Sequence, residues 1–398
     1  MLDHVTRHSN RAGSRSASHP ADHPADHPGS HRRGLRAARL GRRLVPALAL
    51  AAALVLGTTA PAPADPLGLP AAQDLVGVGG QATQSLLDQF STDYNAALTA
   101  GGDTTSPRLT GWDSAGQSPI VPKYGSSLIY RPFSTDAGVI AMDLFGSTTV
   151  NYARAVRPPR PTDPAYLLFI GMAKDAVSWA APAGGNAPAS LTTAQLASIY
   201  ACRTTNWRQI SPVLPDAVIH PVVSGDVTVD RDGVHGSGLD ATSYFLEKID
   251  YARVVAQDPV TDHSCVGVVA RENQGTDPLL QDLDALVPYS VGRYVGQAYG
   301  GHTTPGDAPG PLTPRGINGI TSVNTTTHAI NPQFAATPFG RIVSNVVRQN
   351  EWTAQNANGT ALRAVFGPTG WICGHALTTV RSHGFQPLPG SVCGTVIH

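Results

Sequence analysis

The chain of 398 residues is 41% hydrophobic and 14% charged, a composition that supports a sizeable core and excludes global disorder. Its 28 basic and 28 acidic residues balance, but residues 1–64 hold nine arginines, no lysine and three aspartates. Residues 65–398 therefore carry 19 basic and 25 acidic residues, a formal charge near −6, which argues against a nucleic-acid partner.

Residues 1–64 have the order of a secretory signal peptide: a long n-region rich in arginine, an apolar stretch at 44–56, and a small-residue end at Ala62-Pro63-Ala64. The apolar stretch is too short to span a bilayer comfortably, and no stop-transfer pattern follows it. We therefore predict cleavage near Asp65 and export to the extracellular medium or the cell wall. Arg42-Arg43 leaves twin-arginine export open beside the general secretory route.

The chain has four cysteines, Cys202, Cys265, Cys373 and Cys393, and none of them forms a C-x-x-C pair. This spacing does not support a zinc ribbon or a thioredoxin-type site. An even number of cysteines in an exported protein indicates two disulfides. Three pairings are possible, and the sequence alone does not choose between them. We predict Cys202–Cys265 and Cys373–Cys393.

After a linker over residues 65–73, predicted strands alternate with predicted helices. The first unit, residues 74–100, has a short apolar strand, a glycine-rich loop and a helix with apolar residues at helical spacing. Apolar residues run almost without interruption through 165–181, which predicts two buried strands. The helix that follows begins at Thr192, with Gln195 three residues on, a capping-box arrangement.

The other expected elements continue this alternation. Further strands are predicted at 126–132, 150–160, 217–224, 266–270 and the start of 284–299, a helix or apolar crossover at 137–145, and helices opened by a glycine turn in 236–249 and at the end of 284–299. The pattern predicts an α/β fold with mixed, mostly parallel sheets flanked by helices. Two such units would form two lobes with a cleft between them.

The first of two glycine-rich loops follows the first predicted strand. Its pattern, Gly77-x-Gly79-Gly80, lacks the third glycine of a dinucleotide fingerprint because Ala82 stands there, and no P-loop lysine follows. Two interpretations remain. The loop is either an anion site, in which glycines expose backbone N–H groups at a helix N-terminus, or a plain tight turn.

The second loop, Gly236-Ser237-Gly238, also precedes a predicted helix. Ser237 has glycine on both sides but not two positions away, as the G-x-S-x-G pattern of a nucleophile elbow requires, and although His235 is near, no evident acid completes a triad. Anion binding by the Ser237 hydroxyl is therefore favoured over hydrolysis. Arg131 and Arg154 lie at the ends of predicted strands, where a guanidinium group either recognises an oxyanion or faces solvent.

The order of these motifs carries a resemblance to a known family. The segments are GVGGQATQ, PKYGSSLIYRPFSTDAGV, YARAVRPP, LTTAQLASIYACRTTNW, HGSGLDATSYFL and DALVPYSVGRYVGQ. Together they resemble the phosphate-binding-protein branch of the type II periplasmic substrate-binding proteins. Within this branch they are most similar to secreted actinobacterial relatives, which carry cysteines at positions matching those of this chain. The pattern LT-x-x-QL-x-x-IY-x-x-x-x-TNW, Leu191 to Trp207, is the most specific, and the resemblance covers roughly residues 74–394.

The resemblance implies a two-lobed type II periplasmic-binding-protein fold, in which two crossover strands join the lobes. Lobe 1 would comprise residues 74–152 plus 285–398, and lobe 2 residues 153–284. It also implies a monomer that binds a small anion such as phosphate and serves an ABC transporter permease, with no cofactor, metal ion or catalytic residue. The residues that match the family's ligand loops are Gly79, Gly80, Gln81, Arg131, Ser134, Arg154, Ser237 and Gly238.

The chain departs from the family's motifs at several ligand positions. Gly80-Gln81-Ala82 stands where relatives carry Ser or Thr with an acidic residue, Ala155 replaces a serine, and Leu239 replaces the threonine of G-S-G-T. Each change removes a hydrogen-bond donor that a desolvated phosphate needs. We therefore expect a secreted solute-binding protein for a small oxyanion, with phosphate as the first candidate. The alternatives are a ligand-free scaffold acting as an extracellular interaction protein and, resting only on Ser237 and His235, a secreted hydrolase.

Overall fold

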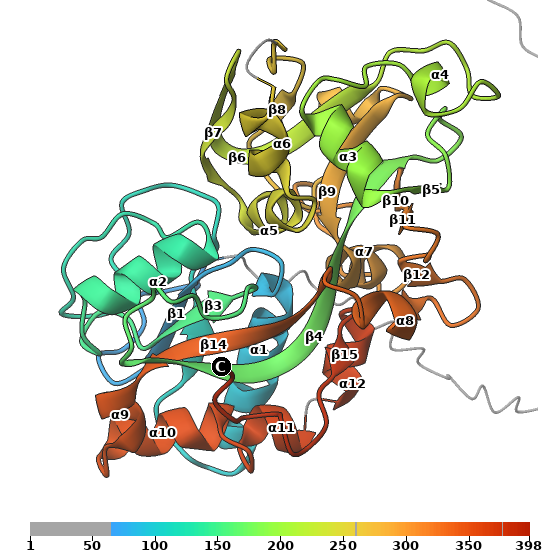
Figure 1. Ribbon diagram of the computed structural model, residues 1–398. Coiled ribbons are helices and arrows are strands. Elements are labelled where there is room, and N and C mark those ends of the chain that lie inside the picture. The colour runs from blue at the N-terminus through green and yellow to red at the C-terminus, as the bar shows by residue number, and fades with distance from the viewer. Residues whose placement is uncertain (1–64, 259–260, 376) are drawn as a thin grey trace, which may run out of the picture. The chain divides into compact units, whose positions relative to one another are not determined.

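The computed structural model describes residues 65–258, 261–375 and 377–398 (Figure 1). The predicted signal peptide, residues 1–64, lies outside the described residues. The described residues belong to one contact unit. None of the helices they form is long and apolar enough to cross a membrane.

The N-terminal part of the fold comprises β1 (Leu75–Gly79), α1 (Gln84–Ala100), β2 (Leu109–Gly111), α2 (Thr135–Leu144) and β3 (Tyr152–Ala155). The fully buried strand β1 pairs in parallel with β2 on one side and with β3 on the other. Helix α1 buries the apolar face that its helical spacing predicts. The strand–loop–helix unit predicted at 74–100 is therefore confirmed.

Two long antiparallel strands, β4 (Leu167–Pro182) and β14 (Gly340–Arg348), cross the middle of the main sheet. β4 is one continuous strand, whereas the sequence predicted two, because the apolar run holds no turn residue that interrupts pairing. Its first part pairs with β14, and its last residues pair with β9 (Ala285–Ser290) and β10 (Leu312–Pro314). Counting β6 (His220–Asp230) and β7 (Gly233–Gly238), the strand order is β2-β1-β3-β14-β4-β9-β6-β7 (Figure 1).

The region after β4 corrects one prediction and confirms another. β6 and β7 form an antiparallel hairpin that includes residues 236–238, so these residues belong to a strand and not to a glycine turn. The capping box of Thr192 and Gln195 is present at the start of α3. The other elements of this region are β5 (Ser190–Leu191), α3 (Thr193–Tyr200), α4 (Trp207–Ile210), α5 (Asp240–Lys248), α6 (Tyr251–Ala256), β8 (Gly267–Val269), a 3-10 helix (Pro278–Gln281) and α7 (Val291–Ala298).

The C-terminal region returns along β14 and ends in short helices. Its remaining elements are β11 (Gly316–Ile317), β12 (Val323–Asn324), β13 (Ala329–Ile330), α8 (Pro332–Ala335), α9 (Gln349–Thr353), α10 (Ala357–Phe366), α11 (Trp371–His375), α12 (Leu377–Ser382) and β15 (Gln386–Pro387). The strand predicted at 126–132 is not formed, since only a single bridge joins Ile129 to Ile120 there. Both predicted disulfides, Cys202–Cys265 and Cys373–Cys393, are present.

The hydrophobic core divides within β4 and β14. Ile170 and Val343 pack with residues of β1 and α1, whereas Trp179 and Phe339 pack with residues of α3 and α5. Residues 285–335 contribute to the second group, although the sequence prediction assigned them to the first lobe. We propose that lobe 2 continues to about residue 339, with β4 and β14 as the two crossover strands.

Candidate functional site

The first glycine loop is bound by Arg154 through the backbone of Gly79 and Gly80. Gly79 ends β1 with φ +101°, and a Cβ atom there would lie 2.9 Å from the Arg154 carbonyl oxygen. The Gly80 N–H donates to that carbonyl oxygen at 3.0 Å. In return, the fully buried guanidinium of Arg154 donates to the carbonyl oxygens of Gly79 and Gly80, at 2.9 and 3.0 Å. Arg154 therefore fixes the loop.

Arg131 lines a pocket, but its charge is already paired. Its guanidinium donates to both carboxylate oxygens of Asp65, at 2.7 and 2.9 Å, and to the carbonyl oxygens of Asp113 and Gln117. A bidentate Arg–carboxylate pair of this kind leaves little capacity for a second anion. Ser134 has a different role, because its hydroxyl caps α2 by accepting from the Ala137 N–H.

The first glycine loop lies close to the start of α5, and a carboxylate fills the space beside it. The side chain of Asp240, the first residue of α5, accepts a 2.9 Å hydrogen bond from the Thr135 N–H at the start of α2. A Cβ atom on Gly80 would lie 2.9 Å from the other carboxylate oxygen of Asp240. Ser237 and Gly238 end β7 just before this helix, and their side chains are outside the described part of the structure.

Two further helix N-termini are capped in the same way. Glu272 accepts from the Ala241 N–H in the first turn of α5 at 2.7 Å, and Asp175 accepts from the Gly292 N–H in the first turn of α7 at 2.9 Å. Arg341 on β14 donates twice to Asp175, at 2.9 and 3.0 Å. We call Asp175, Asp240, Glu272 and Arg341 the carboxylate cluster. Each carboxylate satisfies N–H groups and interacts with the dipole of a helix start, the position that a bound oxyanion would otherwise take.

The carboxylate cluster has one arginine for three buried acids, and the pKa values of two of these acids are raised. Burial, followed by the charge of Asp240, raises the pKa of Glu272 to about 8. Burial also raises the pKa of Asp240. One oxygen of each of these two carboxyl groups has no hydrogen-bond partner among the described residues. Within the described residues, no group of three or more His, Cys, Asp or Glu side chains is arranged to hold a metal ion.

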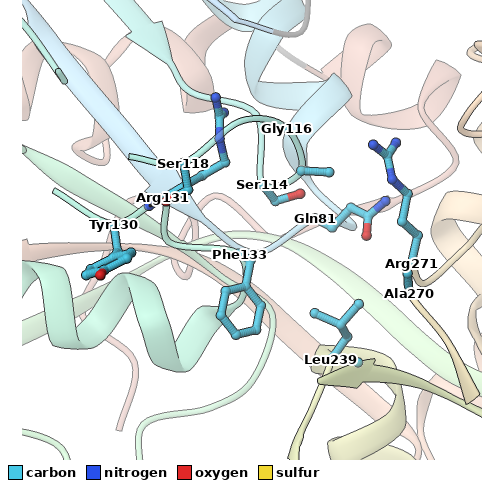
Figure 2. A pocket seen from close by; sticks show the side chains of 12 residues that line it. Gln81, Ser114, Gly116, Ser118, Tyr130, Arg131, Phe133, Leu239, Ala270 and Arg271 are labelled. Atoms are coloured by element: carbon cyan, nitrogen blue, oxygen red, sulfur yellow. Dashed lines mark hydrogen bonds between the residues drawn. The ribbon is translucent and has the colours of Figure 1, made fainter. Parts of the chain in front are cut away.

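A pocket of about 640 Å³ opens beside the carboxylate cluster (Figure 2). Its lining is drawn from the segment before α2, the start of α1, and the segments around Leu239 and Arg271: Gln81, Ser114, Ala115, Gly116, Ser118, Tyr130, Arg131, Phe133, Gly225, Leu239, Ala270 and Arg271. In the described part of the chain, the side chains of Gln81 and Arg271 have no hydrogen-bond or ion-pair partner. The pocket therefore offers one unpaired cation and one free amide.

Comparison with known proteins detects similarity in fold but none in sequence. No family model and no curated protein sequence matches it. A putative phosphate ABC transporter substrate-binding protein with bound phosphate from Clostridium perfringens is similar in structure, with a TM-score of 0.50 and 13% identity over 79% of this chain and 100% of that chain. The chain has the fold of these binding proteins.

Two other solved structures align with most of the chain at lower TM-scores. An ABC-type phosphate transport receptor from Vibrio cholerae aligns with a TM-score of 0.49 and 12% identity over 79% of this chain and 100% of that chain. PstS from Borrelia burgdorferi aligns with a TM-score of 0.42 and 14% identity over 80% of this chain and 99% of that chain. The match to the Clostridium perfringens protein confirms the type II periplasmic-binding-protein fold that the sequence resemblance implies.

Within this binding-protein fold, the structure separates the residues that the sequence grouped as one ligand site. Gln81 and Arg131 are the predicted ligand residues found in the pocket lining among those whose side chains the structure describes, while Gly79, Gly80 and Arg154 form the fixed loop behind it. The sequence missed Arg271 and Glu272, which follow the predicted strand at 266–270. The signal available in the sequence was this pair of a basic and an acidic residue directly after a predicted strand, where ligand-binding residues are commonly found.

Proposed function

We propose that the chain is an exported solute-binding protein that holds an anionic solute in the pocket of Figure 2. The observation that carries this proposal is the unpaired Arg271 guanidinium in a pocket whose other arginine is already paired with Asp65. A guanidinium is suited to bidentate recognition of carboxylate and phosphate groups. Delivery of the solute to an ABC transporter permease by a monomer, which the resemblance implies, is part of the same proposal.

We place the anionic group of the solute at Arg271 and not at the N-terminal ends of α2 and α5. Their first N–H groups already donate to Asp240 and Glu272. At an effective dielectric constant of about 20, a unit charge placed about 4 Å from whichever of these two acids is ionised meets a repulsion of about 4 kcal/mol. The dipole of a helix N-terminus stabilises a nearby anion by at most about 2 kcal/mol. Inorganic phosphate, the first candidate from the sequence, is therefore disfavoured at these helix ends.

Isothermal titration of the purified exported protein against inorganic phosphate, sulfate and small organic anions tests this proposal. We expect at least one of these anions to bind and Arg271→Ala to weaken its binding at least tenfold. The control is Arg208→Ala, at an exposed arginine of α4 outside the pocket, which should leave affinity unchanged.

The absence of binding by every anion would overturn the solute-binding proposal in favour of the alternative raised by the sequence, an extracellular interaction protein built on a ligand-free scaffold. One observation favours that alternative: the chain's own carboxylates already cap the helix starts beside the glycine loops. Binding that is insensitive to Arg271→Ala would equally remove Arg271 from the site.

A further inference from the structure

The pocket has two chemically different ends. Figure 2 shows Gln81 and Arg271 at one end of the view and Tyr130 at the other, with Phe133 and Leu239 below them. Tyr130 is 88% exposed and Phe133 38% exposed, so these aromatic rings face the pocket and solvent and are not packed in the core. The lining thus combines a polar end that bears one free cation with an apolar, aromatic wall.

We infer that the solute is an organic anion with one carboxylate or phosphate head and a flat apolar body, such as an aromatic ring. This inference rests on the proposed function and names its class of solute. The head would pair with Arg271 and accept from the Gln81 amide. The body would lie against Phe133, Tyr130 and Leu239, where aromatic rings stack and apolar surface leaves water.

The size of the pocket supports an organic solute. Its volume of about 640 Å³ lies within the range of about 300–1,000 Å³ that is usual for pockets of organic ligands. A bare oxyanion paired with Arg271 would leave the aromatic wall in contact with water and gain nothing from it. Exposed apolar groups that gather at a concave site commonly mark a binding surface.

The charges of the pocket limit the solute to a single anionic head. Arg131 is the second arginine of the lining, and Asp65 neutralises it. On the inner side, Asp240 and Glu272 directly follow the lining residues Leu239 and Arg271. A second anionic group would lack a free cation and lie near these two acids.

The test is a set of matched ligands, titrated calorimetrically into the purified exported protein. Phenyl phosphate and benzoate carry head and body, inorganic phosphate and acetate carry the head alone, and benzyl alcohol carries the body alone. We expect the two aryl anions to bind at least tenfold more tightly than any of the other three. Phe133→Ala should weaken the aryl anions at least fivefold, leaving phosphate and acetate unchanged, and Arg271→Ala should weaken every anion.

The outcomes separate this inference from the proposed function. Tyr124→Ala, which removes another exposed aromatic ring outside the lining, is the matched control and should change nothing. If inorganic phosphate or acetate binds as tightly as its aryl counterpart, or if Phe133→Ala has no effect, the organic-anion inference is wrong while solute binding stands. If none of the five ligands binds, the solute-binding proposal itself fails. Circular dichroism of each variant establishes that it is folded.

Discussion

The carboxylate cluster and the pocket are built by neighbouring residues of the same segments. Leu239 and Arg271 line the pocket, whereas the next residues, Asp240 and Glu272, are buried and bonded to helix starts. Each of the two segments thus contributes one residue to each region. In the inner region, the carboxylate cluster, N–H groups at the helix starts are bonded to the protein's own carboxylates, whereas the outer region, the pocket, retains a free cation. We propose that the carboxylate cluster takes the place of an anion at the helix starts and that the solute binds beside it.

The largest decrease in unfolding free energy should follow the substitution of Arg341, the cation of the carboxylate cluster. Arg341→Met leaves Asp175 buried without its ion-pair partner and removes the positive charge nearest to Asp240 and Glu272. Removal of one partner of a buried pair destabilises by about 3–5 kcal/mol. Urea denaturation at pH 7 should show this loss, and Arg208→Met, at an exposed pair, should change the unfolding free energy by less than about 1 kcal/mol. Equal effects of the two substitutions would mean that the inner cluster does not stabilise the fold.

A smaller loss should follow the crowding of the contact between the first glycine loop and Asp240. The Cβ atom of Gly80→Ala would lie 2.9 Å from a carboxylate oxygen of Asp240 and 3.2 Å from the Arg154 carbonyl oxygen. Overpacking of this kind costs about 1–3 kcal/mol of unfolding free energy. Gly68→Ala is the matched control, because nothing lies within 4 Å of its Cβ position. A Gly80→Ala protein as stable as the wild type in urea would show that the first glycine loop is not in contact with Asp240.

The ionisation of Glu272 should make the stability of the inner region depend on pH. Because burial raises its pKa in the folded state from 4.5 to about 8, its contribution to stability is complete below pH 4.5 and is lost as the pH rises toward 8. Glu272→Gln still accepts from the Ala241 N–H but cannot ionise. Its unfolding free energy relative to the wild type should therefore increase by at least about 1 kcal/mol between pH 5 and pH 8.

The control for this experiment is Glu247→Gln, at an exposed carboxylate of the same helix α5. If the difference in unfolding free energy between Glu272→Gln and the wild type stays constant from pH 5 to pH 8, Glu272 and Asp240 are not a buried acid pair. Comparison of variant with wild type is essential, since the buried His383, whose pKa is lowered to about 3, makes a contribution of opposite sign below pH 6.5.

The smallest effect should come from the outer region. Arg271→Ala removes a side chain that has no partner among the described residues, so the unfolding free energy should change by no more than about 0.5 kcal/mol. Together with Arg341→Met, this substitution separates an arginine that stabilises the fold from one that is available to a solute. A loss of several kcal/mol in Arg271→Ala, measured by urea denaturation, would show that Arg271 belongs to the structural core.

Local patterns predicted the elements that local interactions form. The capping box at Thr192 and the helix after the first glycine loop depend on residues a few positions apart, and both are present. The hairpin that contains Gly236–Gly238 was missed because its register depends on a partner strand, which no pattern within the glycine segment reveals.

The carboxylate cluster could not be predicted from spacing. Arg341 and Asp175 are 166 residues apart, and Glu272 is 31 residues from the N–H group that it accepts from. The departure of Leu239 from the G-S-G-T motif of the resembling family was visible in the sequence, but the hydrogen bond between Asp240 and the start of α2 depends on the three-dimensional arrangement of α2 and α5. The sequence therefore indicated a departure from the family's motif, and the structure shows which side chain lies beside the start of α2.

The most direct test of the proposal that the carboxylate cluster takes the place of an anion is amide hydrogen exchange, followed by NMR, at Thr135 and Ala241. Each of these N–H groups donates to a buried carboxylate of the protein. We predict slow exchange at both positions before any solute is added, and no further slowing when phenyl phosphate or inorganic phosphate is present. Fast exchange without ligand, followed by strong protection when phosphate is added, would show that a bound anion, and not Asp240 and Glu272, occupies the helix starts.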